Sequence, residues 1–94
     1  MQISVHTASG ASEIHAHWND VMIVQQGSAT LITGGEEIDP ATSADGEIKG
    51  SGIRGGKSHA VAAADIFTVN AGVPHQLQIK PGKTYGAVVI KIKE

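Results

Sequence analysis

Apolar and polar residues alternate along the chain or form short apolar runs, and each run ends at a glycine, a proline or an asparagine. Alternation with a period of two is typical of strands with one buried face, and short apolar runs fit strands buried on both faces. The pattern predicts strands at residues 12–18, 20–26, 29–33, 47–53, 58–63, 66–69, 75–79 and 84–91. Short strands at regular spacing favour an all-β sandwich or barrel.

Residues 36–45 interrupt this pattern, because they contain Pro40, several acidic residues and little apolar content. We predict an exposed loop here, with a plain connection favoured over a substrate lid. The run Ala60–Ala64 has helical composition but is too short between its glycine and aspartate boundaries to form a helix. The chain shows no repeat or linker, so we predict one domain over residues 1–94.

Composition limits the chemistry. With 94 residues the core is thin, and with no cysteine the chain has neither disulfides nor thiolate metal ligands. A transition metal must therefore be held by imidazole and oxygen atoms. The net charge is −2 and the basic residues are scattered, so nucleic acid is not an expected partner. No stretch resembles a leader peptide or a membrane span, and we expect a cytoplasmic protein without membrane contact.

Candidate metal ligands come from three histidines and an aspartate. His15 and His17 are two residues apart, Asp20 follows, and His75 lies behind a Gly-Val-Pro turn. Residues two apart in a strand share a face, so both imidazoles of the pair can meet one ion, and His75 can supply a third ligand from another strand. The alternatives are a solvated histidine pair and an aspartate that binds backbone amides. His59 is expected at the surface, with substitute metal ligation as its alternative role.

Two segments of the chain resemble the motifs of the cupin superfamily. Residues 15–27 contain the histidine pair, an acidic residue and a closing glycine, and residues 65–76 contain an aspartate, a glycine turn and a histidine. Directly before the second segment, Ala64 stands where these motifs usually have glycine. The likeness extends from about residue 13 onward and is greatest to small single-domain bacterial cupins of the cupin 2 type.

The resemblance implies a double-stranded β-helix, a jelly-roll-like barrel that holds a metal in its mouth. The ligands would be the residues matching His15, His17, Asp20 and His75, and the metal a divalent Mn, Fe, Co, Ni, Cu or Zn ion. It also implies a homodimer, which residues 2–6 or 85–90 can form through edge strands.

Two functions follow from these expectations. The first is a metal-dependent enzyme that acts on a polar small molecule by dioxygenase, isomerase, lyase or hydrolase chemistry; the second is a cupin that binds or senses a metal or small ligand without turnover. The fold cannot separate them, and no catalytic base or nucleophile stands out beside the metal ligands. A metal-free barrel is a third reading. Residues 51–58 nearly match a phosphate-binding loop, but they lack its first glycine and its strand-loop-helix setting, so nucleotide binding is not expected.

Overall fold

The structure is a computed structural model that describes residues 2–94, and these residues form eleven strands and no helix. The all-β prediction is therefore confirmed. The strands are β1 (Gln2–His6), β2 (Ser12–His15), β3 (Trp18–Thr33), β4 (Glu36–Ile38), β5 (Ala41–Ala44), β6 (Glu47–Gly50), β7 (Gly52–Arg54), β8 (Lys57–Ala62), β9 (Ile66–Val69), β10 (His75–Gln78) and β11 (Tyr85–Lys93). None of the described residues belongs to a helix that is long and apolar enough to cross a membrane.

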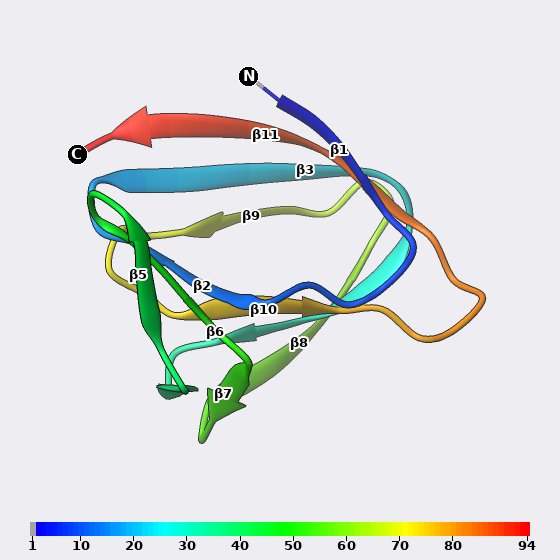
Figure 1. Ribbon diagram of the computed structural model, residues 1–94. Coiled ribbons are helices and arrows are strands. Elements are labelled where there is room, and N and C mark those ends of the chain that lie inside the picture. The colour runs from blue at the N-terminus through cyan, green and yellow to red at the C-terminus, as the bar shows by residue number, and fades with distance from the viewer. Residues whose placement is uncertain (1) are drawn as a thin grey trace.

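Strand β3 joins two antiparallel layers (Figure 1). Its first half pairs with β11 on one side and β9 on the other, and β1 extends this layer beyond β11. Its second half pairs with β10 and β8, and β10 continues through β2 and β6 to β5. We call these the β11 layer and the β10 layer. The pairings among residues 2–94 do not close a complete barrel.

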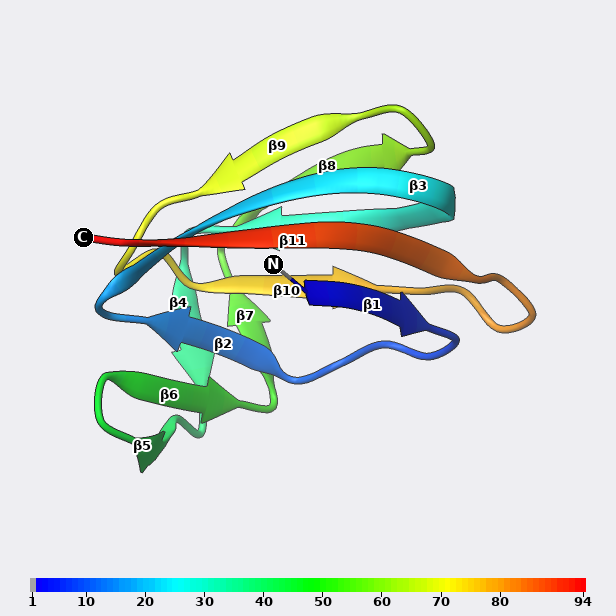
Figure 2. The same ribbon diagram turned by 90° about the horizontal axis from the view of Figure 1, so that it is seen from above.

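Strand β3 bends from one layer into the other (Figure 2). The change falls at Gly27, which is the last residue to pair with β11 before Ser28 pairs with β8. The φ of Gly27 is +75°, and a Cβ added there would lie 1.7 Å from the carbonyl oxygen of Thr84. Only glycine fits such a conformation and such a close backbone approach. The sequence reading of two strands, 20–26 and 29–33, is thus wrong in one respect: they are parts of one bent strand.

Three other boundaries differ from the prediction. Residues 36–45, expected to be a loop, contain strands β4 and β5, and β4 pairs with β7 as a small separate sheet. The predicted strand 47–53 divides at Ser51 into β6 and β7. The predicted strand 12–18 ends at His15, because residues 16–17 form a bend. The last four predicted strands correspond to β8, β9, β10 and β11.

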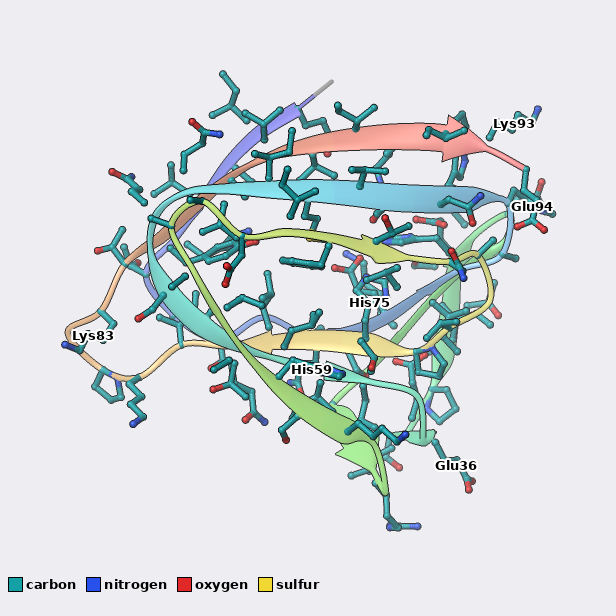
Figure 3. All side chains as sticks on the ribbon, turned by 180° about the vertical axis from the view of Figure 1, so that it is seen from behind. Glu36, His59, His75, Lys83, Lys93 and Glu94 are labelled. Atoms are coloured by element: carbon teal, nitrogen blue, oxygen red, sulfur yellow. The ribbon has the colours of Figure 1, made fainter. Side chains whose placement is uncertain are left out.

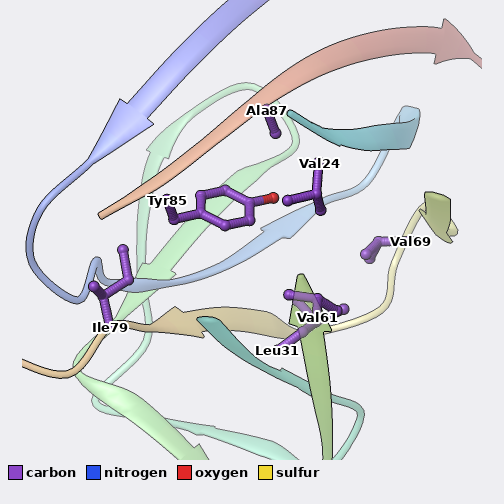
Figure 4. Packing of buried hydrophobic residues seen from close by; sticks show 7 residues of the cluster. All are labelled: Val24, Leu31, Val61, Val69, Ile79, Tyr85 and Ala87. Carbon is purple, nitrogen blue, oxygen red and sulfur yellow. The ribbon is translucent and has the colours of Figure 1, made fainter. Parts of the chain in front are cut away.

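The hydrophobic core lies between the two layers (Figure 4). Side chains from both layers build it, since alternate residues of each strand point inward. On β11 the inward residues Tyr85, Ala87 and Val89 are all buried. The buried cluster consists of Val24, Leu31, Val61, Val69, Ile79, Tyr85 and Ala87. The polar cavity described next lies beside this cluster.

Candidate metal site

Two buried imidazoles face each other at the ends of neighbouring strands. His15 is the last residue of β2, and His75 is the first residue of β10 and pairs with Glu13 across the strands. The two ring centroids are 5.0 Å apart, with 49° between the ring planes. Figure 3 shows His75 in the interior between the layers. Two distant segments therefore bring imidazoles together inside the protein.

Hydrogen bonds fix the orientation of both rings. His75 Nδ1 lies 3.1 Å from the carbonyl oxygen of Val73, which can only accept, so Nδ1 carries the proton. His15 Nδ1 lies 2.6 Å from Oε1 of Glu47, and the same argument holds for this carboxylate. In neutral rings this leaves the lone pair on Nε2 of both histidines. Metal-binding histidines have this arrangement, with the second ring nitrogen held by a carboxylate or a carbonyl group.

Two carboxylates lie beside these rings. One carboxylate oxygen of Glu13 and one ring nitrogen from each of His15 and His75 lie within 4.8 Å of one another. Asp20, on the opposite layer, is 2% exposed, and its Oδ2 is 3.5 Å from Nε2 of His15. Its other oxygen, Oδ1, accepts a hydrogen bond of 3.0 Å from Lys91 Nζ. Two imidazoles and a carboxylate make a donor set that borderline divalent cations accept.

The structure brings three of the four expected ligands, His15, Asp20 and His75, to one place and puts His17 elsewhere. His17 is exposed in the bend after β2, and its ring packs against Gly46, where an added Cβ would lie 2.5 Å from His17 Cδ2. Strand alternation stops at His15, so His17 does not share its face. Whether any of these residues binds a metal stays a prediction.

Glu13 is the member of the group that the sequence reading missed. The sequence did contain a signal for it. Residues two apart in a strand share a face, and this applies to Glu13 and His15 of β2 as it was applied to His15 and His17. The proposed substitute ligand, His59, is exposed on β8, with its Nε2 3.1 Å from Thr33 Oγ1. His59 is therefore outside the group formed by the described residues.

The group opens into a cavity of about 360 Å³ between β1, β2, β10 and β11. Its polar wall includes the histidine pair and three carboxylates, and its apolar wall comes from both layers. The lining residues include Glu13, Asp20, Met22, Glu47, Leu77, Tyr85, Val89 and Lys91. His6 lies at the β1 side, with its ring centroid 6.1 Å from that of Tyr85. A small molecule can therefore reach the histidines within one enclosure.

Burial perturbs two groups that line this cavity. The pKa of His75 lies below its ordinary value of 6.5, chiefly because burial disfavours the imidazolium and also because His15 is nearby. The hydrogen bond to Val73 O and the neighbouring carboxylates oppose this shift only in part. Burial likewise raises the pKa of the Tyr85 hydroxyl above its ordinary value. A neutral His75 is the form that can bind a metal.

No protein-family model matches the chain, and no curated protein matches it in sequence. Function must therefore be argued from the geometry of the cavity.

Proposed function

We propose that this protein binds a divalent transition metal in the cavity through His15, His75 and Glu13, with Asp20 as a fourth candidate ligand. The observation that carries the proposal is the state of the two rings. Both are buried, both have Nδ1 engaged by an acceptor, and a carboxylate oxygen of Glu13 and one ring nitrogen of each histidine lie within 4.8 Å of one another. Two imidazoles oriented in this way suit Mn, Fe, Co, Ni, Cu or Zn.

The charges of the cavity support the same proposal. Glu13, Asp20 and Glu47 contribute three carboxylates to the lining, and Lys91 is its one lysine or arginine. With ionised carboxylates and neutral histidines, the lining has two negative charges in excess. Asp20 is buried and already paired with Lys91, whereas the side chains of Glu13 and Glu47 are 37% and 32% exposed. A divalent cation would neutralise the remaining negative charge that these two carboxylates direct at the cavity.

The arrangement of strands and motifs supports a cupin-type double-stranded β-helix as the finer description of the fold. Two antiparallel layers share β3; Glu13, His15 and His75 lie on neighbouring strands of one layer, and Asp20 lies on the other. The spacing of the ligands also fits the resemblance. If Glu13 and His15 form the ligand pair, four residues lie between the second member of the pair and Asp20. If His15 and His17 formed the pair, only two would lie between them.

For the activity, we favour a metal-dependent reaction of a polar small molecule, of the dioxygenase, isomerase or lyase type. A bound cation would act as a Lewis acid on a ligand oxygen, or would activate oxygen if it is iron or manganese. The chain itself would orient His15 through Glu47 and limit the access of water with Met22, Leu77 and Val89. Binding or sensing without turnover is the second candidate, because Asp20 and Glu47 are already paired with Lys91 and His15 and are poorly placed to move protons.

Metal titration tests the binding proposal. Untagged, chelator-treated protein is titrated with Zn²⁺, Ni²⁺ and Co²⁺ by calorimetry, with bound metal measured by mass spectrometry. We expect His15→Ala and His75→Ala each to weaken binding by at least about tenfold, because each removes an oriented nitrogen ligand. His59→Ala is the matched control and should bind like the unmodified protein. Equal affinities for all three variants would contradict the proposal.

Turnover separates the enzyme from the binder. The Fe, Mn and Zn forms are assayed for oxygen consumption and for proton exchange of small carbonyl compounds. Activity that is lost in His75→Ala but kept in His59→Ala supports an enzyme. Metal binding without any activity supports the binding role.

A further inference from the structure

Lys91 brings the only ammonium group of the cavity lining close to the candidate metal ligands. It follows the buried residues Ala87 and Val89 on the inner face of β11 and pairs in register with Asp20 on β3. Its side chain is 31% exposed, so it is partly desolvated. A lysine placed after a buried apolar row, at the wall of a polar cavity, is positioned to contact whatever the cavity holds.

The Lys91 ammonium has hydrogen-bonding capacity to spare. It carries three N–H donors, and the acceptor that residues 2–94 provide for it is Oδ1 of Asp20 at 3.0 Å. Two donors are therefore left for an acceptor that the protein does not supply. The opening of about 360 Å³ in front of them has room for a molecule of several heavy atoms.

A metal changes which ligands the cavity tolerates. The metal-free lining has an excess of two negative charges, from Glu13, Asp20 and Glu47 against Lys91, and it repels anions. A divalent cation cancels this excess, and it weakens the attraction between the Asp20 carboxylate and the Lys91 ammonium. The loaded cavity then presents two positive centres, the metal and Lys91, to one small ligand.

We infer that the metal-loaded cavity binds a small carboxylate, with one carboxylate oxygen on the metal and a carboxylate group paired with Lys91. The inference rests on the proposed metal site and specifies its ligand class. Hydrogen bonds between ionised groups are among the stronger ones, and truncation of one partner typically weakens binding by about tenfold or more. Neutral molecules of the same size lose the ionic part of this contact and keep at most a weaker hydrogen bond.

The experiment measures oxalate binding to the Ni²⁺-loaded protein by calorimetry, with oxamide as the neutral counterpart. Lys91→Met removes the ammonium, Lys91→Arg keeps a positive charge, and Lys93→Met is the control on the same strand, outside the cavity lining. We expect Lys91→Met to weaken oxalate binding by about tenfold or more, with Lys93→Met unchanged and Lys91→Arg closer to the unmodified protein. Oxamide affinity should depend on Lys91 much less than oxalate affinity does.

The outcomes separate the two proposals. Failure to bind Ni²⁺ would overturn the metal site itself. Normal Ni²⁺ binding with no oxalate binding, or with equal oxalate affinity in Lys91→Met and Lys93→Met, would overturn the carboxylate inference alone. Bound Ni²⁺ is measured for every variant, so a change in metal affinity is not mistaken for a change in ligand affinity.

A second inference concerns the outer face of the β11 layer, which we call the aliphatic face. Its outward residues on four adjacent strands are uncharged, and large apolar side chains dominate it. Ile3 is 77% exposed, Ile66 67%, Val5 60%, Ile92 51% and Ile90 37%. By the strand registers the face comprises Ile3, Val5, Asn19, Val21, Ile23, Gln26, Ile66, Thr68, Gly86, Val88, Ile90 and Ile92.

The geometry points to a second copy of this chain as the occupant of the aliphatic face. The layer that carries the face consists of nine residues of β11, the ten residues of β3 that span its pairing with β11, five residues of β1 and four of β9. At roughly 3.3 Å per residue and 4.8 Å between strands, this is a flat area on the order of 440 Å². Side chains raise the accessible area toward the roughly 600 Å² per partner at the lower end of stable interfaces. An uncharged face offers a charged partner nothing to pair with, whereas two copies related by a two-fold axis match each other. Of the two segments expected to pair through edge strands, β11 lies between β1 and β3 and has no free edge, whereas β1 lies at the end of its sheet.

Sedimentation analysis over about 1–100 µM tests this interface, because dimers dissociate on dilution. The unmodified protein should sediment at twice the chain mass of 9.7 kDa. Ile90→Lys and Ile3→Lys should shift it to monomer. Trp18→Lys is the matched control, since Trp18 is as exposed as Ile90, at 37%, but points to the other side of the layer. A monomeric unmodified protein, or a Trp18→Lys variant as monomeric as Ile90→Lys, would overturn the inference.

Discussion

The hydrogen bond between His15 and Glu47 allows a quantitative test of how the protein prepares its metal site. Glu47 Oε1 lies 2.6 Å from His15 Nδ1, a length typical of a charge-assisted bond. Glu47 is not one of the residues that converge on the candidate ion. Its replacement should therefore weaken metal binding without removing a ligand.

The magnitude follows from the contact. A hydrogen bond to a charged group contributes about 1.5–3 kcal/mol. Glu47 is about one third exposed, at 32%, so solvent screening favours the lower half of this range. Each 1.4 kcal/mol is a factor of about ten in affinity, so Glu47→Leu should weaken Zn²⁺ binding by about ten- to fortyfold. Glu47→Gln keeps an acceptor oxygen and should lose less.

Calorimetric titration with Zn²⁺ at pH 7.5 gives the affinities, and thermal unfolding of the metal-free proteins shows whether the fold is intact. Glu36→Leu is the control, because Glu36 is also a carboxylate but lies exposed on β4. An affinity of Glu47→Leu equal to that of Glu36→Leu would refute the claim that Glu47 orients His15. A complete loss of binding would also contradict it, since Glu47 would then act as a ligand.

Three further predictions concern stability. Gly27→Ala should destabilise the fold by several kcal/mol in chemical denaturation, because its Cβ would overlap the backbone oxygen of Thr84 at 1.7 Å; an unchanged midpoint would contradict the bend geometry. Ala64→Gly should stabilise it by about 1 kcal/mol, because Ala64 has a φ of +79°, and an increase in melting temperature of roughly 4–8 °C checks this. His75 has a pKa below 6.5 when folded, so the unfolded chain binds the proton more readily and the metal-free protein should lose stability as the pH falls from 6.5 toward the folded pKa. Denaturant titrations between pH 7.5 and 5 should show a smaller loss for His75→Gln, and equal slopes would refute the assignment.

The all-β class was predictable from the sequence because alternation and glycine punctuation are local signals. The same signals could not distinguish a turn between two strands from a bend within one strand. Gly27 has the positive φ that either feature uses, and the pairing of its flanks with β11 and β10 decides that β3 continues. Strand β5 was missed because all four of its residues are exposed, so no alternation of apolar and polar side chains marks it.

The candidate site was predictable only in part, for a similar reason. The face on which a histidine lies depends on where its strand ends, and contacts with distant segments decide this. The backbone amide of Ala16 binds Gly46 O, and the amide of Gly72 binds His15 O, so the chain leaves strand geometry before His17. Such pairings are invisible in a single sequence. The convergence of His15 with His75 was expected, whereas the participation of Glu13 in place of His17 was not.

The two layers contribute different parts of the site, and this division has a physical consequence. His15 and His75 with Glu13 belong to the β10 layer, whereas Asp20 and Lys91 belong to the β11 layer. In the metal-free protein the Lys91 ammonium supplies the positive charge that Asp20 needs across the interior. On its other side, Asp20 Oδ2 lies 3.5 Å from Nε2 of His15. A divalent cation bound to the histidines would therefore supply Asp20 with a second positive charge from that side. Metal binding would then connect the layers and free Lys91 for an anionic ligand, so that one ion would couple the stability of the fold to the recognition of its ligand.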